Sequence, residues 1–84
     1  MSKHQKAVLR LLSRPKDYAY KEAEALAMAF GYSVHSMGRT SGPRTRFKRN
    51  GYKDITLHKP HPRKELKRYQ IDSFIKDLKG AGLI

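Results

Sequence analysis

The apolar residues of this chain change their spacing at Gly31, and this change constrains the fold more than any other feature. Upstream, apolar residues recur every three to four positions, which is the period of a helix with one buried side. Downstream, three short segments alternate apolar with polar residues, which is the period of a strand. These segments cover roughly residues 32–37, 44–48 and 54–58, with Gly- and Asn-bearing turns between them. The pattern predicts three short antiparallel strands.

Three helices are predicted to flank these strands. Ser2 and Gln5 match a capping box, which marks the start of the first helix. Gly31 provides the stop of the second helix, and Gly80 is the expected C-cap of the third. The predicted helices cover roughly residues 3–13, 20–30 and 68–79.

The length of the chain limits it to one domain. A chain of 84 residues builds one modest core and buries roughly 60–65% of the surface that its unfolded form exposes. We therefore predict a single domain over residues 1–84, with residues 1–16 as an N-terminal helical extension and residues 17–84 as the core. The expected class is α+β, in the order α-α-β-β-β-α, with the helices on one face of the sheet.

Positive charge dominates the composition. Nineteen Lys and Arg against seven Asp and Glu give a net charge of +12, which implies a polyanionic partner such as nucleic acid, an acidic protein or an anionic membrane. The membrane is the least favoured, because no apolar run approaches the roughly 20 residues of a spanning helix and no signal peptide is recognisable. We expect a cytoplasmic protein. The absence of cysteine excludes thiolate chemistry, and no metal or cofactor is expected.

The cations are concentrated between Glu24 and Asp54, where the sequence has no acid. If Thr45 and Phe47 face the helices, the cations beside them face the opposite, open side of the sheet together with His58. A solubilising surface is the plain alternative, but solubility needs no such exclusion of acids. The sequence therefore predicts an RNA-binding face. The cations assigned to RNA are Arg39, Arg44, Arg46, Lys48, Arg49, Lys59, Arg63 and Lys64.

Four local pieces of sequence form a recognisable pattern in this order. They are Phe30-Gly31-Tyr32 at a helix end, the glycine-led strand from Gly42 to Phe47, the strand and turn from Ile55 to Pro62, and Lys64-Glu65-Leu66-Lys67 before a final helix that closes with Ala81-Gly82-Leu83-Ile84. The pattern resembles the HicA family of toxin–antitoxin toxins, which are small mRNA interferases with a double-stranded-RNA-binding-domain-like fold. The resemblance covers roughly residue 20 to the C-terminus.

The resemblance implies an endoribonuclease that cleaves mRNA without metal, and a cognate HicB-like antitoxin that covers its positive face. One position departs from the family. The usual pattern has Gly-Ser-His, with that histidine taken to be catalytic, whereas this chain reads Gly42-Pro43-Arg44. Arginine can hold phosphate or stabilise negative charge, but it cannot act as a general base at neutral pH.

The histidines are the candidates for proton transfer. Metal-free RNA cleavage needs one group to deprotonate the 2′-hydroxyl, another to protonate the leaving oxygen, and a cation near the phosphate. His58 is the first candidate, because alternation places it beside the strand cations, and His35 is the second, because its strand alternates less regularly. His61 is the third. For His58 the alternative is a histidine that only binds RNA, and for His61, held between Pro60 and Pro62, it is a structural turn.

Two other functional classes stay open. A non-catalytic module like a double-stranded-RNA-binding domain, or an inactive HicA relative, would use the same basic surface to read A-form shape through backbone and 2′-hydroxyl contacts. A basic DNA-binding protein ranks last, because no helix-turn-helix is recognisable. The basic helix start that would serve such a module contains Arg63, Lys64, Lys67 and Arg68.

Overall fold

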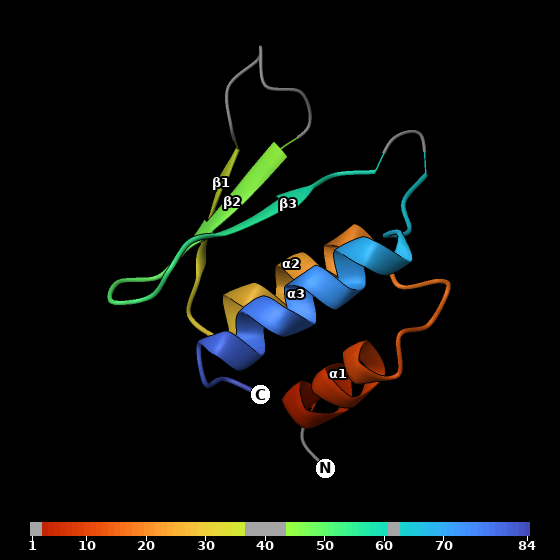
Figure 1. Ribbon diagram of the computed structural model, residues 1–84, viewed down its shortest axis with the longest axis horizontal. Helices are drawn as coiled ribbons and strands as arrows, with labels where there is room; N and C mark the ends of the chain where they lie inside the picture. Colours follow the sequence, from red (N-terminus) through yellow and green to blue (C-terminus); the bar gives the residue numbers. More distant parts are fainter. Residues whose placement is uncertain (1–2, 37–43, 61–62) are drawn as a thin grey trace.

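The computed structural model describes residues 3–36, 44–60 and 63–84 (Figure 1). Every helix and strand lies within one residue of its predicted ends. Ser2, one half of the predicted capping box, lies outside the described residues. The elements are α1 (Lys3–Leu12), α2 (Tyr20–Ala29), β1 (Ser33–Ser36), β2 (Arg44–Lys48), β3 (Ile55–His58) and α3 (Arg68–Gly80).

The molecule has three layers. The strands form one antiparallel sheet in the order β1-β2-β3. Helices α2 and α3 pack beneath one face of this sheet, α2 against β1 and α3 against β3, while α1 packs on the far side of the two helices (Figure 1). The other face of the sheet carries no helix in the described part of the chain. This is the predicted α+β fold of the double-stranded-RNA-binding-domain-like kind, with the helices on one face.

The core lies between the sheet and the helices. Thr45 and Phe47 of β2 are 1% and 0% exposed, so the predicted alternation along this strand is confirmed. The ring of Phe47 lies against that of Phe74, with centroids 6.4 Å apart. Beside it, the hydroxyl of Tyr20 donates a hydrogen bond of 2.8 Å to Thr45 Oγ1. Burial raises the pKa of Tyr20 to about 12, so this hydroxyl keeps its proton at neutral pH and holds β2 on α2.

The two main helices end on glycines with left-handed backbone. Gly31 ends α2 as predicted, with φ of +91°. The C-cap predicted for α3, Gly80, was wrong. Gly80 is still helical, Ala81 is the C-cap, and Gly82 takes the positive φ, +74°. Leu83 N then donates to Leu78 O at 3.0 Å, which closes a Schellman motif. Gly80 and Gly82 are both able to adopt the left-handed backbone at a helix end. Which of them does so depends on where the last helical turn stops, and the sequence does not show this.

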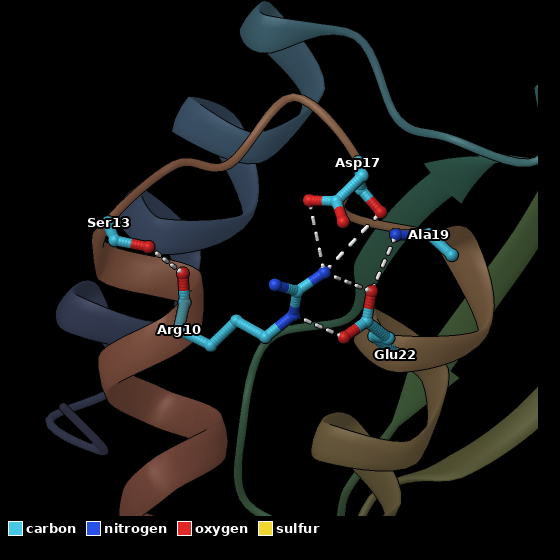
Figure 2. A network of polar contacts seen from close by, with 5 residues as sticks. All are labelled: Arg10, Ser13, Asp17, Ala19 and Glu22. Carbon is cyan, nitrogen blue, oxygen red and sulfur yellow. Dashed lines mark hydrogen bonds and ion pairs between the residues drawn. The ribbon is translucent and has the colours of Figure 1, made fainter.

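Helix α1 is joined to α2 by a buried side chain and a charged network. Leu11 is fully buried. Figure 2 shows how Arg10 reaches across to Glu22, with Nε donating to Oε1 and Nη2 to Oε2, the latter at 3.1 Å. Arg10 Nη2 also lies 3.3 Å from Asp17 Oδ1. Glu22 Oε2 accepts a further bond from Ala19 N at 2.9 Å, so one carboxylate caps α2 and binds α1 at once.

This network predicts a loss of stability in acid. The bond from Arg10, aided by Ala19 N–H and opposed by desolvation, lowers the pKa of Glu22. The ionised Glu22 carboxylate therefore stabilises the fold above the pKa that glutamate has in the unfolded chain, about 4.3. This stabilisation is lost as pH falls through the lower pKa of Glu22 in the folded protein. Arg10→Met should lower the melting temperature by a few degrees near neutral pH, and the deficit should shrink in acid. Thermal unfolding followed by circular dichroism measures it, with Lys6→Met as the exposed control on the same helix; a deficit that is constant down to strong acid would contradict the prediction.

Candidate nucleic-acid interface

The open face of the sheet gathers cations and histidines from all three strands. The outward residues of β2 are Arg44, Arg46 and Lys48, as predicted. The strand register places Arg44 opposite His58 of β3 and Arg46 opposite His35 of β1. Both histidines are exposed to solvent. These five side chains form the sheet-face patch.

His58 and Arg44 are in direct contact. Arg44 Nε donates a hydrogen bond of 3.3 Å to His58 Nε2. A guanidinium has only donors, so the accepting Nε2 carries a lone pair and the imidazole proton sits on Nδ1. In this contact Nε2 is the accepting nitrogen of His58, and it lies on the open face. The arginine at the usual family histidine position thus touches the histidine of the neighbouring strand.

His35 is held in the opposite hydrogen-bonding state. Ser33 Oγ lies 3.1 Å from the carbonyl oxygen of Lys48, to which it donates. The same Oγ lies 2.9 Å from His35 Nε2. Because the single hydroxyl proton is used on the carbonyl, Nε2 of His35 is the donor in that contact. The patch therefore presents one accepting imidazole and one donating imidazole, on the two strands that flank β2.

Two other predicted cations, Arg46 and Arg49, interact with neighbouring side chains of this protein. Arg46 Nε lies 3.7 Å from Asp54 Oδ2, so a carboxylate offsets part of its charge. Arg49 follows the end of β2 that is remote from Arg44, and its guanidinium carbon lies 4.2 Å from the ring centroid of Tyr52. The structure therefore does not bring Arg49 together with His58. Arg44 is the strand cation nearest to the candidate base.

Three further predicted cations lie together beyond the end of β3. Lys59, Arg63 and Lys64 line a hollow of about 620 Å³ together with other residues that include Tyr20, Lys21 and the acid Glu24. The ammonium of Lys59 lies 5.4 Å from the ring centroid of Tyr20. Lys21 could not be found from the sequence, because it lies in another helix and joins these cations only through the fold. The loop patch consists of Lys21, Lys59, Arg63, Lys64 and Lys67.

A second hollow joins the two patches. It has a volume of about 280 Å³, and His58 lines it together with Lys59, Arg63, Lys67 and Tyr69. A phosphate backbone that crosses the sheet at His58 would therefore meet the loop patch next. This continuity suits a polyanion, because successive phosphates need successive cations.

Gln70 fixes the backbone of His58. Its side chain is buried, Nε2 donates to the carbonyl oxygen of His58 at 3.0 Å, and Oε1 accepts from Lys67 N at 2.9 Å. The amide thus ties the first turn of α3 to the end of β3. Gln70 was not among the site residues predicted from the sequence. The available signal was a glutamine three positions after the residue that precedes the helix, which is one half of a capping box.

Two predicted site residues, Arg39 and His61, lie outside the described residues. Within residues 3–36, 44–60 and 63–84, no group of three or more His, Cys, Asp or Glu side chains suits a metal ion. No helix in those ranges is long and apolar enough to cross a membrane.

Comparison with known proteins identifies one family. The family model described as HicA toxin of bacterial toxin-antitoxin matches residues 20–82. The match includes α2, the three strands and α3, and it begins after α1. No curated protein and no solved structure matches the chain.

Proposed function

Because the chain belongs to the HicA family of toxins from toxin–antitoxin systems, we propose that it is an mRNA interferase, an endoribonuclease that cleaves mRNA without metal. The contact between Arg44 and His58 is the observation that carries this proposal. It supplies an accepting imidazole beside a fixed cation on an exposed basic face, which are two of the requirements for cleaving RNA through its own 2′-hydroxyl.

In the proposed reaction, Arg44 Nε–H turns from His58 Nε2 to a phosphate oxygen, and the freed lone pair of Nε2 takes the proton of the 2′-hydroxyl. The 2′-oxygen attacks the adjacent phosphorus, and the bond to the 5′-oxygen of the next nucleotide breaks. The products are a 2′,3′-cyclic phosphate and a 5′-hydroxyl. His35, in its doubly protonated form, is our candidate for protonating the leaving oxygen, with its Nε2–H turning from Ser33 Oγ to that oxygen, and His61 remains the third candidate for either proton transfer.

Arg44 has a separate proposed role. Without RNA, Nε of Arg44 donates to His58; once Nε turns to the substrate, all the guanidinium N–H groups are available for phosphate oxygens. Negative charge grows on those oxygens as the 2′-oxygen attacks, so a fixed cation there stabilises the transition state more than the ground state. We propose that Arg46, Lys48, Arg49, Lys59, Arg63 and Lys64 hold the flanking phosphates, and Arg39 stays a predicted RNA contact from the sequence.

The test is incubation of the purified protein with end-labelled single-stranded RNA in EDTA. We expect fragments that end in a 2′,3′-cyclic phosphate. RNA that stays intact but migrates more slowly would support the alternative, a non-catalytic module like a double-stranded-RNA-binding domain or an inactive HicA relative. That alternative is favoured by the presence of Arg44 where the family pattern has histidine.

RNA binding should depend steeply on salt, because several phosphates are neutralised at once. Replacing Arg44 and Arg46 together by alanine should flatten the slope of log K against log salt by about 1–2, since one or two phosphate contacts are lost. Fluorescence anisotropy over a salt series measures this slope. A variant with Lys76→Ala and Lys79→Ala on α3 removes the same charge and should keep the wild-type slope. An unchanged slope in the arginine variant would move the binding site away from β2.

The family implies a cognate antitoxin. We propose that it is a HicB-like acidic chain that covers the sheet-face patch, since an acidic surface complements this dense positive face. NMR titration of the labelled toxin with its antitoxin should then shift the backbone amides of Arg44–Lys48 and leave those of Lys3–Leu12 on the remote helix unchanged. A saturated complex with unperturbed Arg44–Lys48 amides would refute this position.

A further inference from the structure

Tyr69 is an exposed aromatic ring in a basic surface. It lies in the first turn of α3 and is 66% exposed, whereas Tyr18, Tyr20 and Tyr32 are buried. Within the described part of the chain, Tyr69 has no hydrogen-bond, ion-pair or ring partner. An exposed aromatic face surrounded by cations has a composition typical of surfaces that bind single-stranded nucleic acid.

Gln70, the residue after Tyr69, fixes the position of Tyr69 relative to His58. Gln70 donates to the carbonyl oxygen of His58, which brings the first turn of α3 to the end of β3. Tyr69 and His58 therefore line the same hollow of about 280 Å³, together with Lys59, Arg63 and other residues. In Figure 1 the start of α3 lies at the same end of the molecule as the end of β3. An aromatic ring, three cations, the carboxylate of Glu65 and the candidate base line one small hollow.

We propose that Tyr69 is a stacking platform for one base of single-stranded RNA, next to the phosphate at His58. This inference rests on the proposed function and adds the class of substrate. A base can lie on the tyrosine ring only where it is unpaired and turned out of its own stack. Lys59 and Arg63 would meanwhile contact the phosphates on either side. In duplex RNA the bases are paired inside the helix, so the ring would have nothing to stack on.

The binding experiment uses a labelled single-stranded oligoribonucleotide whose 2′-oxygens are methylated, so that no cleavage competes. Tyr69→Ala should weaken its affinity by about ten- to a hundred-fold, the usual effect of losing one stacked base. Tyr69→Phe should bind like the wild type, because the ring is kept. Tyr69→Leu, which keeps apolar bulk without an aromatic face, should behave like Tyr69→Ala. Met28→Ala, at an exposed apolar residue of α2, is the control that should change nothing.

Two further readouts separate stacking from a general loss of binding. One abasic ribose moved along the oligonucleotide should weaken wild-type binding at one position, and the same substitution should have no added effect in Tyr69→Ala. The salt slope of Tyr69→Ala should equal that of the wild type, because no phosphate contact is lost. Affinity for a duplex of the same sequence should be unaffected.

The results that overturn this inference are distinct from failure of the proposed function. Equal affinity of Tyr69→Ala and wild type for the single strand would overturn it, and so would equal losses on single-stranded and duplex RNA. If the wild type binds single-stranded RNA without ever cleaving unmethylated RNA, the nuclease proposal fails, and the Tyr69 comparison still decides the stacking. If the wild type binds no RNA, both proposals are overturned.

Discussion

Replacing His58 by glutamine is expected to abolish RNA cleavage while leaving RNA affinity within about a few-fold of the wild type. General acid–base participation is worth roughly 10²–10⁴ in rate, and a neutral amide cannot take the proton of the 2′-hydroxyl. Its carbonyl oxygen can still accept the bond from Arg44 Nε, so the surface is preserved. Single-turnover cleavage of end-labelled RNA gives the rate, and anisotropy with methylated RNA gives the affinity.

Matched variants separate this role from simple binding. Arg44→Ala should weaken both cleavage and affinity, because it removes a phosphate contact and the partner of His58. In a protein that already carries His58→Gln, adding Arg44→His places an imidazole where the family pattern has one, and some cleavage should return. Full cleavage by the His58→Gln protein, with its fold verified by circular dichroism, would exclude His58 and direct the search to His35 and then His61.

The largest expected loss of stability is that of Phe47→Ala. Phe47 is 0% exposed and its ring meets that of Phe74, so truncation opens a cavity between β2 and α3. Such changes reduce the free energy of unfolding by about 3–5 kcal/mol, which is a large part of the roughly 5–15 kcal/mol that holds a domain together. Urea unfolding monitored by circular dichroism measures the change.

Two control variants accompany Phe47→Ala. Phe47→Leu keeps most of the buried apolar surface and should cost clearly less than Phe47→Ala. Lys48→Ala changes the next residue, which is exposed on the open face, and should leave the free energy of unfolding within about 0.5 kcal/mol. If Phe47→Ala proved no worse than Lys48→Ala, the contact between β2 and α3 would not be the centre of the core.

Much of the fold and part of the site could be predicted from the sequence, because the signals involved are local. The alternation of Arg44–Lys48 depends on a period of two within five residues, so it placed Thr45 and Phe47 inside and the cations outside. The same local signal placed His58 on the open face with those cations. Gly31 ended α2 for an equally local reason, since it is the residue that best tolerates the left-handed backbone there.

The contacts that could make this face a site were decided only by the tertiary structure. The register that puts Arg44 opposite His58 depends on how the strands align across their turn. The bond from Gln70 to His58 and the hollow shared with Tyr69 depend on where α3 begins against β3. Lys21 joins the loop patch from α2 in the same way. These side chains come from different elements, and periodicity within each element carries no information about how packing and loop closure bring the elements together.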